Sequence, residues 1–427
     1  MIVRGGTIVT PRGMEQVDIV VNHGRIAEIG PHLEGYGQVI DARGLHVFPG
    51  GIDSHVHFNE PGRTDWETIA SGSEALAAGG YTAFIDMPLN NLPVTTDLAA
   101  FDLKLAAMQR SSAVDFGIWG GLVPGNVDQL RGLVEHGATG FKAFMCASGI
   151  DEFPAVDPDT LREGMARIAE LDSILLVHAE APGRLLTPQG TGPSDFIRSR
   201  PPEAEVEAIE EAIAIARDTG CRLHVVHVST VQGITAIQEA QLHGVEVSAE
   251  TCPHYLLYAE EDLERLGGAA KCAPPFRSAG NRDDLMAMVA GGEVEMIVSD
   301  HSPSTLELKQ GDDFTRIWGG ISGCQSTRQL LLAQARVEPS VLAAMTSTNI
   351  ARRFRLSNKG DIAPGFDADL WLVDLSVEDV VRNEDLLYRI PFSAHSGQRI
   401  RGRTVQTLVR GGPPAPGAGR LLNQARN

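Results

Sequence analysis

The sequence predicts an α/β protein, a (β/α)8 barrel (TIM barrel) with a small β-sandwich domain built from both chain ends. The chain has 427 residues, enough for a barrel and a satellite domain. Short apolar runs recur through its middle, each followed by a helix-compatible stretch, whereas both ends alternate apolar and polar residues. We expect residues 1–49 and 357–427 to form the β-sandwich domain together and residues 50–356 to form the barrel.

The two ends carry the period-two pattern of strands. "MIVRGGTIVT" and "VDIVVNHGRIAEIG" alternate near the start, with glycine-containing turns between the apolar residues. The same alternation of apolar and polar residues appears near the end, in "GDIAPGFDADLWLVDL" and "RTVQTLVRGG". Strand-rich segments on either side of a different middle indicate one β domain shared by both ends.

The middle of the chain contains eight candidate strands. Their expected ends lie near His57, Pro88, Leu122, Lys142, His178, His227, Glu250 and Asp300. Eight strand–helix units in about 300 residues fit a (β/α)8 barrel. A doubly wound sheet is the competing architecture, but no GxGxxG or GxxxxGK[ST] loop follows a strand, and a GxSxG elbow is missing too.

Composition and charge narrow the class of protein. The formal net charge is −19, which disfavours a nucleic-acid partner because such a partner needs a basic stripe. The five scattered cysteines form no CxxC pair and are expected to be reduced thiols. No signal peptide or membrane-spanning run is apparent, so a cytoplasmic protein without a membrane partner is expected.

Histidines gather at the predicted strand ends. His55 and His57 lie at i and i+2 in "DSHVHFNEPG", so on a strand both side chains face the same way. His178 and His227 each follow an apolar run. Any one of them alone would more often be a structural histidine. Four converging on one barrel mouth indicate ligands, because imidazoles gain little from apolar burial.

Lys142 and Asp300 complete this set of strand-end residues. A lysine that points into a barrel is costly unless it is paired or neutral. A salt bridge to Asp300 or Glu180 is the simpler interpretation of Lys142. The alternative is that a neutral amine takes up CO2, and the resulting carbamate bridges two cations.

Four histidines, a modified lysine and an aspartate suit two divalent metal ions. Zinc is the expected metal, with Co2+ or Mn2+ as alternatives, since imidazole and carboxylate ligands suit it. A carboxylate-like bridge holds two ions about 3.5–4 Å apart, and a shared water would have its pKa lowered from about 15.7 towards 7. The pattern therefore predicts hydrolysis by a hydroxide nucleophile.

This pattern resembles the amidohydrolase superfamily, and "GDIAPGFDADLWLVD" is similar to its C-terminal signature. The resemblance covers essentially the whole chain. It implies one metal on His55, His57 and Asp300, the other on His178 and His227, and N6-carboxylated Lys142 bridging both. It also implies that Asp300 is the general base and acid, taking a proton from the bridging hydroxide and passing it to the leaving nitrogen.

Within the superfamily the chain is most similar to the cyclic-amide hydrolases. Dihydroorotases resemble "HxHxREPG", whereas "HVHFNEPG" has Asn59 in place of the arginine that grips a substrate carboxylate. Dihydropyrimidinases and hydantoinases carry a tyrosine where this chain has Ala147. The remaining motifs resemble allantoinases: "DMPLNNLPVTT", "FKAFMCASG", "ETCPHY", "KCAPPFR" and "WGGISGCQ".

The resemblance implies opening of the hydantoin ring of allantoin to allantoate, a step of purine catabolism, by a homotetramer. The candidate substrate-reading residues, which would form hydrogen bonds with this amide-rich substrate, are Asn59, Asn90, Ser148 and the backbone around Ala273 and Gly319. Asn90 could instead form an Asx turn before Pro93, and Ser148 could simply belong to a loop.

Three alternatives stay open: action on another cyclic amide (as hydantoinase, dihydropyrimidinase or dihydroorotase), a non-enzymatic scaffold of the same fold, and a nucleic-acid-binding module. The six intact ligands disfavour the scaffold. His224, three residues before His227, is expected to be structural, and His301 to orient Asp300 or the substrate.

Overall fold

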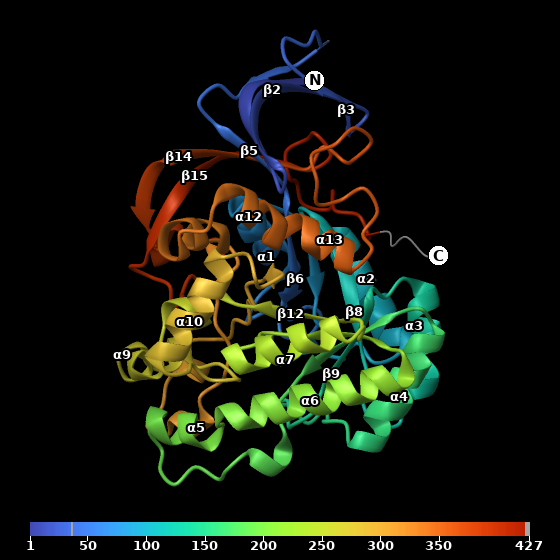
Figure 1. Cartoon of the computed structure of the whole chain (residues 1–427), viewed down its shortest axis with the longest axis vertical. Coiled ribbons are helices and arrows are strands. Elements are labelled where there is room, and N and C mark those ends of the chain that lie inside the picture. The colour runs from blue at the N-terminus through green and yellow to red at the C-terminus, as the bar shows by residue number, and fades with distance from the viewer. Residues whose placement is uncertain (36, 423–427) are drawn as a thin grey trace.

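The computed structural model describes residues 1–35 and 37–422, which form a large α/β body with a smaller sheet at one end (Figure 1). Within these residues, eight parallel strands make one curled sheet. In spatial order they are β6 (Gly51–Val56), β7 (Tyr81–Asp86), β8 (Asp115–Gly121), β9 (Gly140–Phe144), β10 (Ile174–His178), β11 (Arg222–Val225), β12 (Val247–Thr251) and β13 (Met296–Ile297). This confirms the predicted barrel class.

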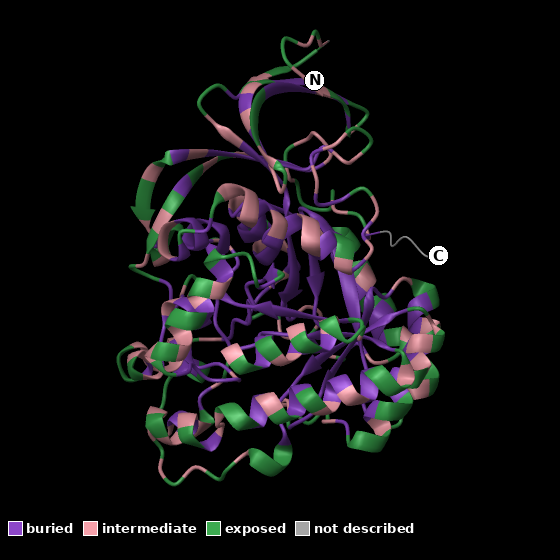
Figure 2. Cartoon of the chain, viewed as in Figure 1, coloured by how far each residue is buried: buried purple, intermediate pink, exposed green. Residues whose placement is uncertain are grey.

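The two edges of the curled sheet meet. Val56 at the end of β6 forms a parallel bridge with His301, shortly after β13, and the His57 N–H donates to the His301 carbonyl at 2.8 Å. All eight strands are buried throughout, as the purple strands of Figure 2 show, which fits the continuous apolar runs typical of parallel strands covered on both faces. The carboxyl ends of all strands therefore surround one mouth.

Helices surround this sheet, with their exposed residues facing outward (Figure 2). The longer ones are α1 (Ile69–Ala78), α2 (Leu98–Ser111), α4 (Pro158–Glu170), α6 (Pro202–Thr219), α7 (Val231–Leu242) and α10 (Ala279–Ala290). Shorter ones are α3 (Leu130–His136), α5 (Pro193–Ser199), α8 (Pro253–Leu257), α9 (Leu263–Leu266), α11 (Thr327–Leu330), α12 (Pro339–Ala343) and α13 (Asn349–Arg353), with π-helical turns at Leu331–Ala335 and Ala344–Thr348.

Local sequence explains where these helices begin and end. The Thr230 side chain accepts a hydrogen bond from the Gly233 N–H and so caps α7, as Asp157 does for Thr160 at the start of α4. α6 begins with a proline in its first turn and ends at Gly220, whose φ of 71° suits glycine.

Both chain ends build the second sheet, as predicted. In the described part of the chain its strands are β1 (Ile2–Thr10), β2 (Gly13–Asn22), β3 (Arg25–Gly30), β4 (Val39–Asp41), β5 (His46–Pro49), β14 (Leu370–Val380) and β15 (Arg399–Leu408). Their order is β15-β14-β5-β1-β2-β3, with β4 paired to β1, so N-terminal β5 lies between β1 and C-terminal β14. The domain boundaries at 49/50 and 356/357 stay a prediction.

A buried ion network connects this sheet region to the barrel. Lys359 Nζ lies 2.6, 2.9 and 2.7 Å from carboxylate oxygens of Asp115, Asp367 and Asp369, and Arg410 also pairs with Asp115. Asp115 begins β8, so the network lies at the end of the barrel away from its mouth. The three carboxylates are close enough to hold a metal ion, but lysine and arginine already supply the positive charge.

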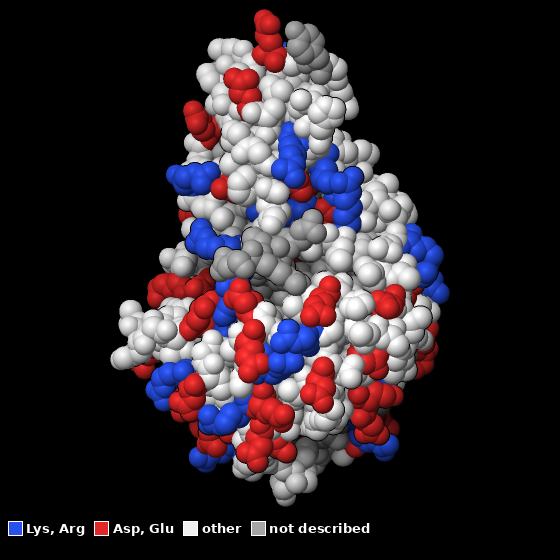
Figure 3. All heavy atoms as spheres, turned by 90° about the vertical axis from the view of Figure 1, so that its right-hand side faces the viewer, with Lys and Arg blue, Asp and Glu red and all other residues white. Residues whose placement is uncertain are grey.

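Acidic and basic side chains are interspersed over the face drawn in Figure 3, without a continuous basic stripe there. None of the helices in the described residues is both long and apolar enough to cross a membrane.

Candidate metal centre

All six predicted ligands lie at the carboxyl ends of barrel strands and are buried. His55 belongs to β6 and His57 follows it directly. His178 is the last residue of β10, and Lys142 lies within β9, two residues before its end. Two further ligands come after strands, His227 after β11 and Asp300 after β13. The predicted strand ends lie within three residues of the observed ones, which is why these side chains converge.

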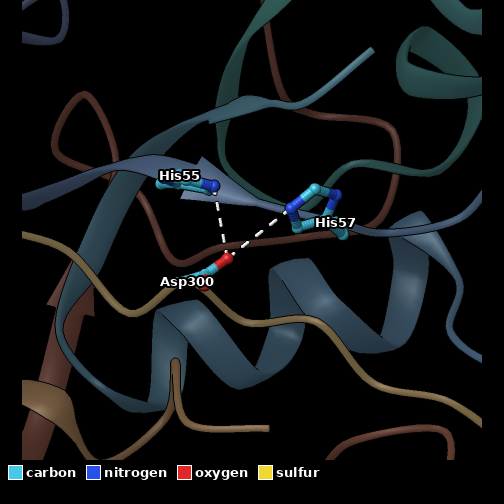
Figure 4. A group of neighbouring side chains, drawn as sticks. All are labelled: His55, His57 and Asp300. Carbon is cyan, nitrogen blue, oxygen red and sulfur yellow. Dashed lines mark ion pairs between the residues drawn. The ribbon is translucent and has the colours of Figure 1, made fainter. Parts of the chain in front are cut away.

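His55, His57 and Asp300 form the first group (Figure 4). The Nε2 atoms of His55 and His57 lie 3.2 and 3.5 Å from the same oxygen, Oδ1 of Asp300. One ligand atom from each residue lies within 4.8 Å of the others. Two imidazole nitrogens and one carboxylate oxygen facing a common point are suitable ligands for a divalent metal.

His178 and His227 form the second group. Nδ1 of His178 lies 3.1 Å from Nε2 of His227, so the two rings present nitrogens to each other. The ring centroids of His55 and His227 are 5.4 Å apart, which places the second group beside the first. This arrangement brings the two groups together as the sequence predicted.

Buried acceptors fix the outer nitrogens of three of these histidines. Nδ1 of His55 lies 2.5 Å from Oε1 of Glu250, and Nε2 of His178 lies 2.8 Å from Oε2 of Glu180. Nδ1 of His57 lies 2.8 Å from the carbonyl of Leu89. A proton on each of these nitrogens leaves the inner nitrogen free to bind metal, as metal-binding histidines commonly require.

These roles of Glu180 and Glu250 were not predicted from the sequence. Glu180 follows His178 by two residues in "HAE", and this spacing could have identified it. Glu250 ends "VEVSAE" at the predicted end of the seventh strand. It also contacts Nε2 of His224 at 3.0 Å, while Nδ1 of His224 contacts Ser248, so His224 is a buried structural residue, as expected.

Lys142 lies in the same region, with its Nζ 5.0 Å from the centroid of the Phe144 ring. Within the described residues its Nζ has neither a hydrogen-bond partner nor an ion pair, so the simpler interpretation, a salt bridge to Asp300 or Glu180, is wrong. Burial lowers the pKa of Lys142 to about 7, although Glu250 and Asp300 oppose this shift. An unpartnered buried amine with a low pKa is suited to reaction with CO2.

Asp300 has the opposite electrostatic environment. Burial alone would raise its pKa, but the imidazoles of His55, His57 and His227 outweigh this effect and hold the pKa well below its ordinary value. Asp300 and His227 also have left-handed backbone φ values of 44° and 39°. Such conformations are strained for non-glycine residues and are often found at functional sites.

A cleft of about 420 Å3 opens onto both groups of ligands. Four of the five predicted substrate-reading residues line it: Asn90, Ser148, Ala273 and Gly319. Asn59 does not line the cleft. It is buried, and its Nδ2 donates to the Pro303 carbonyl at 3.3 Å.

The side chains that line the cleft also include cations that were not predicted from the sequence. Arg200 lines it, with Nη2 3.4 Å from Oε2 of Glu180, and Lys271 lines it while donating to backbone carbonyls. His301 was expected to orient Asp300 or the substrate. Its Nε2 instead contacts Oε2 of Glu67, and its Nδ1 accepts a hydrogen bond from the Gly323 N–H.

The chain is similar to a known protein family and to several proteins of known function. A family model described as "Amidohydrolase family" matches residues 46–412. An allantoinase of Rubrobacter xylanophilus is 50% identical over 423 residues, which cover 96% of this chain and 93% of that protein. An allantoinase of Solibacter usitatus is 48% identical over 421 residues, which cover 96% and 92%.

Solved structures similar to this chain are hydantoinases and dihydropyrimidinases. The L-hydantoinase (dihydropyrimidinase) of Arthrobacter aurescens has a TM-score of 0.95 and 31% identity, with 99% of both chains covered. The dihydropyrimidinase of Brevibacillus agri has a TM-score of 0.90 and 28% identity, with 100% of this chain and 99% of the other covered.

Proposed function

The chain belongs to the amidohydrolase family, and we propose that it is an allantoinase, which hydrolyses the cyclic amide bond of allantoin to give allantoate. The observation that carries this proposal is the similarity to curated allantoinases, at up to 50% identity over 96% of the chain. The site supports it, since buried imidazoles and a carboxylate at a barrel mouth are suited to metal-dependent hydrolysis.

Two divalent ions are part of this proposal, with zinc as the expected metal. His55, His57 and Asp300 would hold one ion, His178 and His227 the other, and Lys142 would bridge both. When bound, the ions lower the pKa of a shared water and polarise the substrate carbonyl. The buried, unpartnered Nζ of Lys142 supports the fit, because an unmodified ammonium would repel two cations.

The bridge requires a modified lysine. The neutral amine of Lys142 attacks the carbon of CO2, so that an N–C bond forms while one C=O π bond opens. The nitrogen then passes a proton to a water molecule, which leaves a carbamate anion. Its two oxygens would then serve the two ions. A pKa of about 7 supports this step, because only the unprotonated amine has the lone pair that it needs.

Asp300 is the proposed catalytic acid and base. Its carboxylate lies next to the inner nitrogens of His55 and His57, where it is placed to accept a proton from the attacking water. It then delivers this proton to the ring nitrogen as the amide bond breaks.

The substrate-reading residues remain proposals. Allantoin is a hydantoin ring with a ureido arm, so it carries several amide donors and acceptors and no carboxylate. Asn90, Ser148, Ala273 and Gly319 line the cleft and can meet those groups through backbone or side-chain atoms. Asn59 has a buried Oδ1 without a hydrogen-bond partner among the described residues, which supports a polar role close to the site.

A second candidate function is hydrolysis of hydantoins or dihydropyrimidines. The similarity of the fold to hydantoinases and dihydropyrimidinases favours it. Against it, the cleft is lined by Ala147 at the position where the resemblance expects a tyrosine in those enzymes.

A substrate panel tests the proposal. We expect kcat/KM for allantoin to exceed that for hydantoin, dihydrouracil and dihydroorotate, with dihydroorotate among the poorest because Asn59 stands where the resemblance expects dihydroorotases to have the arginine that grips the carboxylate. A preference for hydantoin or dihydrouracil would establish the second candidate, and a preference for dihydroorotate would contradict both.

The homotetramer and the cytoplasmic location also remain proposals. The tetramer rests on the family resemblance, and sedimentation equilibrium of the purified enzyme tests it. The location is supported by the five cysteines, all buried and unpaired. Fractionation of cells that express the protein tests it.

A further inference from the structure

One wall of the cleft is a segment with little regular structure. Residues 315–320 line the cleft next to Lys271 and Ala273, and they include Gly319, a proposed substrate-reading position. The segment lies between Asp300 and α11 and contains only a short 3-10 turn, Phe314–Arg316. Something other than a helix or a strand must therefore hold its shape.

Lys271 supplies part of that support. Its Nζ donates to three backbone carbonyls, those of Phe314 at 2.8 Å, Thr315 at 2.9 Å and Ile317 at 2.5 Å. The residue is 4% exposed, and its ammonium also lies over the Phe196 ring, 4.7 Å from the centroid. Three donors meeting three carbonyls use the full capacity of a lysine ammonium.

Lys309 supports the other end of the wall. Its Nζ donates to the carbonyls of Trp318, at 3.1 Å, and of Gly320. Lys309 is 8% exposed, and neither it nor Lys271 forms an ion pair among the described residues, although the Asp313 carboxylate acts on Lys271 at longer range. Five carbonyls between residues 314 and 320 are thus held by two buried ammonium groups.

Main-chain hydrogen bonds leave the N–H and C=O of one residue of this wall unused, those of Gly319. The Trp318 N–H donates to the Leu308 carbonyl at 2.9 Å, and the Gly320 N–H to the Lys271 carbonyl at 2.7 Å. Within the described residues, the main-chain N–H and C=O of Gly319 between them make no hydrogen bond. Trp318 and Gly320 are therefore fixed on either side of Gly319, and Gly319 itself lines the cleft.

We propose that Lys271 and Lys309 are positioning residues that fix the 314–320 wall and so present the Gly319 backbone to the substrate. A buried lysine without a carboxylate partner costs free energy that an apolar side chain would not. The free-energy cost of burying these two lysines is consistent with a need for hydrogen-bond donors to the backbone carbonyls of this wall. The inference rests on the proposed function only for the identity of the substrate, since the wall is fixed in either case.

The test compares Lys271→Met and Lys309→Met with the wild type in the metal-loaded enzyme. Methionine keeps similar length and loses the ammonium, so the carbonyls lose their donors. We expect KM for allantoin to rise about tenfold or more, because unsatisfied buried carbonyls release the wall. The change in kcat should be smaller, and the metal content should stay at the wild-type value. Backbone amide exchange across residues 314–320 should become faster.

Lys359→Met is the matched control, since it removes another buried lysine far from the cleft. It should lower stability without changing KM or exchange in the wall. Lys271→Arg and Lys309→Arg, which keep a positive charge and several donors, should give intermediate KM values, and they decide the matter if a methionine variant does not fold.

Two results would overturn the proposal: KM and wall exchange unchanged in the lysine variants, or a loss of stability alone, as in the control. If the wild type does not hydrolyse allantoin, the proposed function fails, while faster exchange confined to the wall still supports the role of the lysines.

Discussion

Oε2 of Glu180 lies 2.8 Å from Nε2 of His178 and 3.4 Å from Nη2 of Arg200, so one carboxylate oxygen joins a proposed metal ligand to a cation of the cleft. Glu250 contacts His55 in the same way in the other group of proposed ligands. Each proposed ion therefore has one histidine whose orientation depends on a buried carboxylate.

Glu180→Gln should lower the affinity for the ion proposed at His178 and His227 by about 10–100-fold, because the amide is a poorer partner for the His178 N–H than the carboxylate. Chelator competition measures the affinity of each ion separately. Glu246→Gln is the control, since Glu246 pairs with Arg222 on the strand ends away from the cleft. If the Glu180 variant binds the metal with wild-type affinity, then Glu180 does not contribute to metal binding.

Removal of metal should abolish activity. We expect two divalent ions per chain in the active enzyme, because the ligands form two adjacent groups. Elemental analysis before and after dialysis against a chelator, with activity measured on the same samples, checks this. Full activity in protein without metal would contradict the proposed mechanism.

Lys142→Ala should lose metal and activity together, because the bridge disappears. A small carboxylic acid added to the variant should partly restore both by filling the space that the carbamate would occupy. The mass of the intact wild-type protein and the electron density at Nζ report the modification directly. An active, metal-loaded crystal with an unmodified Nζ would count against carboxylation.

Asp300→Asn should keep the fold and reduce turnover by about 10²–10⁴-fold, the usual contribution of a general acid and base. The amide cannot accept the proton, and it is also a weaker metal ligand. Turnover should therefore be measured at saturating metal, with the circular dichroism spectrum as the check on folding. Turnover near that of wild type would exclude Asp300 from the proton transfer.

Lys359→Met should lower the free energy of unfolding by about 3–5 kcal/mol, because it leaves three buried or partly buried carboxylates without their lysine. Denaturant unfolding measures the loss. Arg162→Met breaks an exposed pair with Asp218 and should cost at most about 1 kcal/mol.

The loss in Lys359→Met should grow as the pH rises above the ordinary pKa of an aspartate, about 3.9. Burial raises the pKa of Asp369 even with Lys359 present, and without the lysine this pKa rises further. A carboxyl with a raised folded pKa loses stability as pH rises through that value. In wild type, burial alone would lower the pKa of Lys359, but Asp369, Asp115 and Asp367 raise it, so the lysine stays charged at these pH values. A loss independent of pH would contradict this account.

Much of the barrel and its proposed ligands could be predicted because both depend on apolar runs with defined ends. Parallel strands align their carboxyl ends, so residues such as His178 and Asp300, which are 122 positions apart by number, meet at one mouth. The partner of each histidine could not be predicted in this way, because Glu180 looks like any other carboxylate in the sequence.

Two other features depend on backbone direction, which a sequence pattern does not report. The alternation of His55 and His57 predicts that Asn59 faces the same way, but β6 ends at Val56 and Asn59 has a φ of 59°. Its side chain consequently turns to Pro303 instead of lining the cleft. Lys271 likewise gives no sign in the sequence that it will meet three carbonyls.

The place of β5 between β1 and β14 has a consequence for synthesis on the ribosome. Residues 46–49 are made early, and their second partner, residues 370–380, is made after the whole barrel. The nascent chain therefore carries an open strand edge for most of its translation. Such edges pair readily with other chains, so this stage is where a molecular chaperone would protect the protein most.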